Sequence, residues 1–315
     1  MVARDFSAEK LKLRRIYESP NYGAYRNTAF PGGCCKVDDV YGPLLFPEFP
    51  GERSYTYGSF VMSVDGRIAF PGSPDGTLLA KTNRLDPDGG VIDFWILNLL
   101  RAVSDAVVMG SVTLQREPYL SGRIFDDDLA DCRASAENPP LPLHVVITRT
   151  GNNLPVDHRV FKEREIPAVI AASPEGVEKI SRRYPGRVRL IDAEQLSGLN
   201  LYAAAGYDPE RPLLLRFGRG DHFDARLLLQ LLKRGGCDTT LIESPTFLAH
   251  LMREKLLDEM FLNTSGLFIG GNALTLGENA PAFSAESHPH TEVLTVHSHS
   301  DSFFYFRYKL DYSDL

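Results

Sequence analysis

Small and hydroxyl-bearing residues follow two short apolar runs of the chain, a pattern that suits phosphate binding. Gly110 and Ser111 come directly after the apolar run 106–109, and Ser244 follows the run 239–242. A glycine lets the backbone approach a ligand closely, and free N–H groups at a helix start bind phosphate oxygens. Taken singly, each place is explained as well by ordinary helix capping. Together they predict a pyrophosphate held between two helix starts.

A third polar pair, Thr148 and Arg149, comes at the end of the apolar run 143–148. A guanidinium group flanked by hydroxyls suits the 2′-phosphate that distinguishes NADP from NAD. A turn with a solvent-facing arginine explains the pair equally well. The first alternative predicts NADPH as the cofactor.

The segments that position these residues alternate between strand and helix patterns from residue 54 onward. Short apolar or β-branched runs predict strands, and a helical spacing of apolar residues predicts helices. The strands are expected at 55–64, 106–109, 143–148, 168–172, 213–217, 239–242, 259–263, 292–297 and 303–310, and the helices at 91–103, 224–234 and 246–255. This order predicts an α/β fold with a mainly parallel sheet flanked by helices and an antiparallel C-terminal edge.

Residues 1–53 read as an N-terminal extension, and residues 54–315 as the main domain. Within the extension, residues 8–17 predict a short basic helix, and residues 21–49 show no sustained helix or strand period. We expect the extension to pack on the main domain or to lie at an oligomer contact.

Composition narrows the class of protein. The 315 residues carry a net charge of -7, which argues against a nucleic-acid binder. No apolar run suits a membrane span or a signal peptide, so a cytoplasmic protein is expected. The four cysteines include no CxxC pair, which excludes a zinc-dependent deaminase and favours reduced thiols without structural disulfides.

No metal site is expected from the remaining polar clusters. The acidic run 126–128 opens a stretch, 126–142, that reads as an exposed insertion with a solvated loop. The histidine pairs in 288–290 and 297–299 could share a strand face, but no carboxylate or cysteine pattern joins them.

Several segments together resemble the C-terminal reductase domain of the riboflavin-biosynthesis deaminase-reductases. The resemblance rests on the strand end 63–69, the segment 100–113, the stretch 241–260 and the Ile-Gly-Gly at 269–271. It implies a dihydrofolate reductase-like fold, NADPH-dependent reduction of a ribosylated aminopyrimidine phosphate, and a homodimer. No nucleic-acid or membrane partner is implied.

The resemblance also implies roles for individual residues. Asp65, Arg67 and Glu117 are the candidates for catalysis, with Arg67 matched to a basic residue near the substrate's ring carbonyl. The candidates for substrate binding are Thr82, Arg84 and Arg101, with Arg101 at the phosphate, and those for the cofactor are Ser63, Gly110, Ser111, Thr113, Thr148, Arg149, Glu243, Ser244 and Thr246.

The sequence departs from the family pattern at three places, and these departures bear on which substrate is expected. The chain has Glu243-Ser244-Pro245 where the family usually has Glu-Gly-Gly-Pro. In the loop that follows Thr113, Glu117 is its only carboxylate. It also has Ser265-Gly266 where the family has Ala-Pro. These predict a different substrate or weakened catalysis. The alternatives are a noncatalytic NADP(H)- or nucleotide-binding regulatory protein on the same fold and, with no distinct signature, a flavin-binding reductase.

Overall fold

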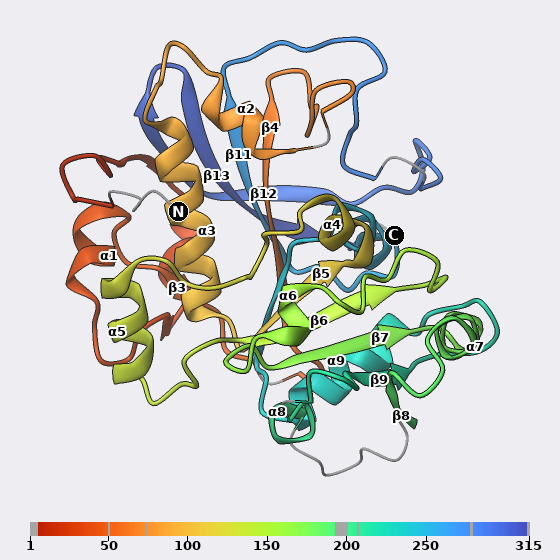
Figure 1. The fold of residues 1–315 in the computed structure, drawn as a ribbon. Helices are drawn as coiled ribbons and strands as arrows, with labels where there is room; N and C mark the ends of the chain where they lie inside the picture. The colour runs from red at the N-terminus through yellow and green to blue at the C-terminus, as the bar shows by residue number, and fades with distance from the viewer. Residues whose placement is uncertain are drawn as a thin grey trace.

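The protein is built around an 11-stranded sheet in the order β1-β12-β13-β11-β4-β10-β5-β6-β7-β9-β8. The computed structural model describes residues 6–49, 51–73, 75–192, 201–206, 208–277 and 280–313. Figure 1 shows helices on both faces of this sheet. The prediction of a mainly parallel α/β fold is confirmed.

The parallel strands are short and mostly buried. Except for the edge strand at 189–192, their positions follow the predicted apolar runs, because a strand covered on both faces has no need of polar alternation. They are β4 (Tyr55–Ser63), β5 (Ala106–Gly110), β6 (Leu143–Thr148), β7 (Ala168–Ala172), β8 (Arg189–Asp192), β9 (Leu213–Arg216), β10 (Thr239–Ile242) and β11 (Glu259–Ser265).

The C-terminal hairpin adds the predicted antiparallel edge. β12 (His290–Ser300) pairs with β13 (Phe303–Asp311), and β13 pairs with β11. A further small sheet joins β2 (Asn27–Thr28) to β3 (Leu45–Phe46).

The helices divide between the two faces of the large sheet. One core lies beneath α1 (Cys35–Val40), α2 (Thr77–Lys81), α3 (Gly89–Val103), α4 (Ser111–Arg116), α5 (Asp127–Ser135), α6 (Arg159–Lys162) and α7 (Pro174–Arg183). The other lies beneath α8 (Leu201–Ala204), α9 (Ala225–Arg234) and α10 (Pro245–Arg253). Each face is therefore closed by helices, as the apolar strands require.

The N-terminal segment contributes to the first core and to the sheet. Leu11 is fully buried, and Phe30, Val40 and Phe46 join the same apolar cluster. The helix predicted at 8–17 is wrong, because β1 (Arg14–Glu18) instead pairs antiparallel with β12. Open backbone groups at the edge of β12 outweigh a weak helical pattern in so short a segment. A 3-10 turn, η1 (Pro20–Ala24), follows.

Cys34 and Cys132 form a disulfide, so the prediction of four reduced thiols is wrong. The bond ties the start of α1 to α5. Cys35 and Cys237 are free, the first exposed and the second buried. The pairing joins residues 98 positions apart, a distance that cysteine spacing alone does not reveal.

Asp126 corrects the expectation of a solvated acidic loop. It is buried, caps α5 by accepting the Leu129 N–H, and also accepts the indole N–H of Trp95 at 3.0 Å. Lys36 Nζ lies 2.6 Å from its carboxylate. The acidic run therefore begins with a structural anchor for the N-terminal segment.

Replacing Cys34 with serine is expected to lower the free energy of unfolding by about 2–4 kcal/mol, because the disulfide closes a long loop. Urea unfolding followed by the fluorescence of Trp95 measures the change. Cys35→Ser is the matched control, since it removes an exposed free thiol next to the bond. Equal unfolding midpoints for the two variants would contradict the prediction.

Candidate functional site

The carboxyl ends of the central parallel strands bring the predicted cofactor residues to one edge of the sheet. In the order β4-β10-β5-β6, these ends carry Ser63, Ser244, Gly110 and Thr148 respectively. β10 lies between β4 and β5 although it comes much later in the chain. Ligands of open α/β sheets bind at such an edge, where helix starts offer free N–H groups.

Gly110 faces the side chains that begin two helices. A β-carbon built on Gly110 would lie 3.0 Å from Ser244 Oγ and 3.5 Å from Thr113 Oγ1. Ser244 caps α10 by accepting the Phe247 N–H. Ser111, the first residue of α4, is buried beside them. The backbone of Gly110 and these hydroxyls thus converge at one point.

Arg149 follows the end of β6, the strand next to β5 in the sheet, and its side chain extends into solvent. Its side chain is 65% exposed, with Asp221 3.6 Å away as an exposed partner. The preceding residue, Thr148, is buried and accepts the Gly151 N–H. The Arg149 carbonyl approaches Gly176 so closely that a β-carbon there would lie 2.4 Å from it. The turn is fixed and the guanidinium is accessible.

Ser63, Asp65 and Arg67 form a hydrogen-bonded turn at the end of β4. Ser63 Oγ donates to Asp65 Oδ1 at 2.6 Å, and Asp65 also accepts the N–H groups of Ile269 and Gly270. The Ser63 hydrogen bond, with these backbone donors, lowers the pKa of Asp65. Asp65 is therefore an ionised anchor for the 269–271 loop and is unsuited to donating a proton.

The Arg67 side chain is also directed to this loop. Its Nη1 donates to the Ala273 carbonyl at 3.0 Å, and its Nε lies 3.6 Å from Asp65. Nε is buried without a hydrogen-bond partner among the described residues. A role for Arg67 at a substrate carbonyl stays a prediction.

Arg101 and Glu243, expected on separate ligands, bind each other. Arg101 Nε and Nη2 donate to the two carboxylate oxygens of Glu243 at 2.7 and 2.6 Å. The side chains are 2% and 10% exposed. Binding of a substrate phosphate through Nε and Nη2 of Arg101 would require this ion pair to open, and a role for Arg101 at the phosphate stays a prediction.

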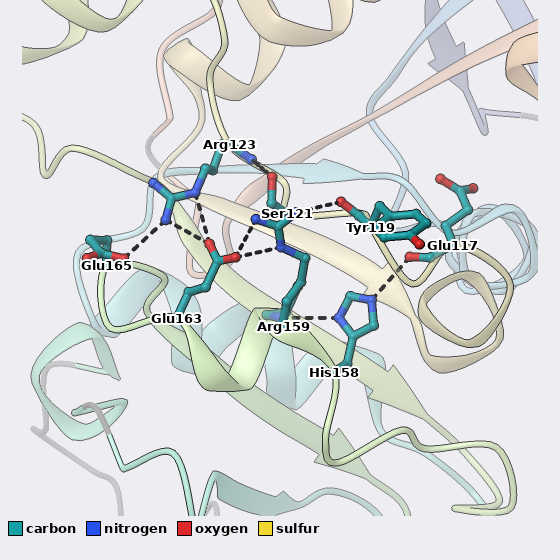
Figure 2. Close-up of polar contacts among 9 residues, drawn as sticks. Glu117, Tyr119, Ser121, Arg123, His158, Arg159, Glu163 and Glu165 are labelled. Carbon is teal, nitrogen blue, oxygen red and sulfur yellow. Dashed lines mark hydrogen bonds and ion pairs between the residues drawn. The ribbon is translucent and has the colours of Figure 1, made fainter. Parts of the chain in front are cut away.

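Glu117 ends α4 and is held in place by the segment 158–165. His158 Nδ1 accepts the Val160 N–H, which leaves the proton on Nε2, and Nε2 donates to the Glu117 carbonyl at 3.1 Å. Arg159 donates to the Tyr119 carbonyl. The Glu117 carboxyl points away from these contacts (Figure 2).

The same network fixes the rest of this loop. Arg123 lies 2.7 Å from Glu163 and 3.1 Å from Glu165, and Arg159 also pairs with Glu163 (Figure 2). Residues 117–123 are thus tied to the loop beyond β6 by charged groups at one end and by His158 at the other. The backbone that carries Glu117 is therefore held in one position.

Charge and burial act together on Glu117. Burial, and then the negative charges of Asp75 and Glu243, raise its pKa, while Arg101 and Lys81 oppose the shift. A carboxyl group with a raised pKa is suited to hold a proton closer to neutral pH than an exposed one. Glu117 therefore remains the better candidate for an acid than Asp65.

Thr82 and Arg84 lie at and just beyond the end of α2. Both are exposed, and Thr82 Oγ1 donates back to Leu78 at the end of α2. Asn83, between them, donates to the Ser302 carbonyl at the β12–β13 turn. Thr246 is exposed on the first turn of α10. Roles for Thr82 and Arg84 at the substrate and for Thr246 at the cofactor stay predictions.

In the described part of the chain, no three His, Cys, Asp or Glu side chains are grouped so that they could hold a metal ion. No helix in that part combines the length and apolar character needed to cross a membrane.

The sequence profile of the RibD C-terminal domain matches residues 55–295, most of the chain. The chain belongs to the RibD C-terminal domain family. The match begins at β4, and it includes the strand ends that carry the candidate site. Among curated proteins, none matches this chain.

Solved structures share the fold of this RibD-type domain. A pyrimidine reductase-like protein from Corynebacterium diphtheriae aligns with a TM-score of 0.60 and 15% identity, over 87% of this chain and 97% of that one. RibD from Acinetobacter baumannii aligns at 0.53 and 18% identity over 82% of this chain. A diaminohydroxyphosphoribosylaminopyrimidine deaminase/5-amino-6-(5-phosphoribosylamino)uracil reductase from Thermotoga maritima aligns at 0.52 and 17% identity over 87% of this chain.

This chain spans only 58% and 59% of the Acinetobacter and Thermotoga proteins. At these identities the likeness concerns the fold. What those proteins act on is therefore not transferred to this chain by similarity alone.

Sequence reasoning missed one carboxyl group on the side of the sheet covered by α3. Asp93 accepts a hydrogen bond from Asn263 Nδ2 at 2.7 Å. Its signal in the sequence is an acid on an apolar helix stripe, since Ile96, Leu97 and Leu100 follow at helical spacing. A charge in that position is unusual unless it is partnered or functional.

Proposed function

We propose that the chain is an NADPH-dependent reductase that acts on a ribosylated aminopyrimidine phosphate or a closely related nitrogen heterocycle. One observation carries the proposal: Gly110 lies so close to the hydroxyls that begin two helices that a β-carbon there would be 3.0 Å from Ser244 Oγ and 3.5 Å from Thr113 Oγ1. Membership of the RibD C-terminal domain family supports a reductase in riboflavin biosynthesis, and the pairing of family members supports a homodimer.

The residues at this edge fit a phosphorylated dinucleotide. The open backbone of Gly110 and the hydroxyls of Ser111 and Ser244 suit a pyrophosphate. The exposed guanidinium of Arg149 suits a 2′-phosphate. The reduced nicotinamide supplies a hydride when bound. The protein's own task is to orient both ligands, exclude water and hold a proton, for which Glu117 is the candidate.

Titration of the full chain with NADPH tests the proposal directly. We expect the fluorescence of the reduced nicotinamide to report binding, and its absorbance to fall when a ribosylaminopyrimidine phosphate is added. Absence of NADPH binding at micromolar protein would overturn the proposal. Binding without oxidation on any such substrate would favour a noncatalytic nucleotide-binding protein instead. Sedimentation at the same concentrations gives the oligomeric state.

Arg149→Ala is expected to weaken NADPH binding by about 10- to 100-fold, the usual range for a hydrogen bond to a charged group, and to leave NADH binding nearly unchanged. The two dissociation constants are measured by fluorescence titration. Arg216→Ala is the matched control, because Arg216 is an exposed arginine at the end of β9, two strands beyond β6. Equal losses for NADPH and NADH would show that Arg149 does not contact the 2′-phosphate.

A further inference from the structure

An open hollow of about 330 Å³ lies where the N-terminal segment meets the last residues of β12. Six residues line it, and all are polar: Lys12, Arg14, Ser298, His299, Ser300 and Asp301. Arg14 is opposite Ser298 in the antiparallel pairing of β1 with β12. The N-terminal segment therefore contributes one side of the hollow and the end of β12 the other. None of the six belongs to the candidate site at the Gly110 edge.

Two cationic side chains on the N-terminal side of this hollow have no charged partner. Lys12 and Arg14 are both exposed, and neither forms an ion pair within the part of the chain that the structure describes. The next residue, Arg15, is by contrast paired with Glu18. Ammonium and guanidinium groups are the usual side-chain ligands of phosphate oxygens. Two of them on one wall of a hollow favour an anionic ligand there.

On the opposite side, His299 is held in place by a buried carboxylate. Its Nδ1 lies 2.8 and 2.9 Å from the two carboxylate oxygens of Asp86, whose side chain is 1% exposed. Nδ1 must therefore carry a proton and donate it to Asp86. The other ring nitrogen, Nε2, has no hydrogen-bond partner among the described residues and is left for a ligand.

The segment that carries Asp86 is itself fixed to the β12–β13 turn. Ser300 Oγ donates to Asp86 at 2.6 Å, and Asn83 Nδ2 donates to the Ser302 carbonyl at 3.0 Å. Asn83 and Asp86 are both buried. The side of the hollow that carries His299 is thus rigid before any ligand arrives. Preorganised groups lose less entropy when they bind, so the site is suited to a small ligand.

Asp301 adds a different kind of group to the lining. It is exposed, and its carboxylate can only accept hydrogen bonds when it is ionised. A bare anion would be repelled by it, whereas a ligand that also carries hydroxyl groups would bind to it. The lining offers no apolar or aromatic surface on which a ring could stack. The lining therefore favours a polyhydroxylated molecule with one phosphate group.

We propose that this hollow is a second ligand site, which binds the phosphate ester of a small polyhydroxylated molecule such as a sugar. Lys12 and Arg14 bind the phosphate, His299 contributes Nε2, and Asp301 accepts hydrogen bonds from the hydroxyl groups. Asp86 is the residue that positions His299. The site does not depend on the proposed reductase activity, because it shares no lining residue with the Gly110 edge.

Calorimetric titration of the full chain with glucose 6-phosphate, glucose and inorganic phosphate tests the proposal. We expect glucose 6-phosphate to bind more tightly than either of the other two. The double variant Lys12→Ala with Arg14→Ala is expected to weaken it by about 10-fold or more, because charge-assisted hydrogen bonds are lost. Arg26→Ala with Lys309→Ala is the matched control, since it removes an exposed arginine and an exposed lysine outside the hollow.

Asp301→Asn separates the two parts of the ligand. It removes the charge that repels phosphate and weakens the acceptor for hydroxyl groups. We expect it to reduce the preference for glucose 6-phosphate over inorganic phosphate. An unchanged preference would overturn the assignment of a polyhydroxylated ligand.

Other results would overturn the site itself. These are no saturable binding of glucose 6-phosphate at millimolar concentration, or equal binding by the unaltered protein and the Lys12 and Arg14 double variant. A loss in Arg149→Ala with none in the double variant would place the phosphate at the Gly110 edge instead. Circular dichroism confirms folding. If the double variant does not fold, His299→Gln carries the comparison: weaker binding of glucose 6-phosphate supports the proposal, and unchanged binding overturns it.

Discussion

Arg101→Ala is expected to lower the free energy of unfolding by about 3–5 kcal/mol, because it leaves the buried carboxylate of Glu243 without its partner. The two hydrogen bonds between these side chains measure 2.7 and 2.6 Å, and the arginine side chain is 2% exposed. Urea unfolding followed by Trp95 fluorescence and by circular dichroism gives the change.

The double variant Arg101→Ala with Glu243→Ala separates the ion pair from other losses. If the pair dominates, the double variant is much more stable than the sum of the two single losses predicts. A different result would instead support the role implied by the family resemblance: an unchanged unfolding midpoint in Arg101→Ala together with a raised KM for a phosphorylated substrate.

Arg307→Met is expected to be destabilising by a similar amount, about 3–5 kcal/mol, because it isolates the buried carboxylate of Glu259. Arg307 Nε donates to Glu259 at 2.7 Å, and neither side chain is exposed. The guanidinium also lies 5.4 Å from the Tyr22 ring centre and 4.8 Å from that of Phe46. Loss of this group is therefore expected to loosen the N-terminal segment as well.

Thermal unfolding measures the stability of Arg307→Met, and limited proteolysis reports the exposure of residues 6–49. The control replaces both partners with apolar residues, Arg307→Met with Glu259→Leu. Removing both charges of a buried pair is often neutral, whereas removing one is costly. A single variant as stable and as protease-resistant as the double one would contradict the assignment.

The strands that were predicted best are those covered on both faces. The bounds expected at 143–148, 168–172 and 239–242 are those of β6, β7 and β10. All residues of these three strands are buried and most are apolar, so the local sequence carries most of the signal. β8 was missed because it is an edge strand with half-exposed residues and has no continuous apolar run.

The N-terminal segment shows the opposite case. The pattern of residues 8–17 is short and weakly helical, and the chain forms β1 there because β12 offers an edge to pair with. The disulfide between Cys34 and Cys132 likewise depends on α1 lying beside α5. Neither the pairing partner nor the neighbouring helix is encoded near these residues.

For the candidate site, residue type and spacing were enough to place small and hydroxyl-bearing residues at the ends of apolar strands. That inference depends on short-range patterns, because glycine, hydroxyl and apolar positions each follow local geometric rules. It is why the α/β class and the family could be predicted, and the fold and family profile agree with both.

The interaction partners of the charged residues were decided by tertiary packing alone. Arg101 and Glu243 lie 142 positions apart, and Asp93 and Asn263 lie 170 apart. Their partners depend on which strands become neighbours and on which groups are buried together, since burial makes an unpaired charge costly. Tertiary structure thus placed an expected phosphate ligand, Arg101, in a buried ion pair, and revealed a half-buried carboxylate where the sequence showed only one acid in an apolar helix.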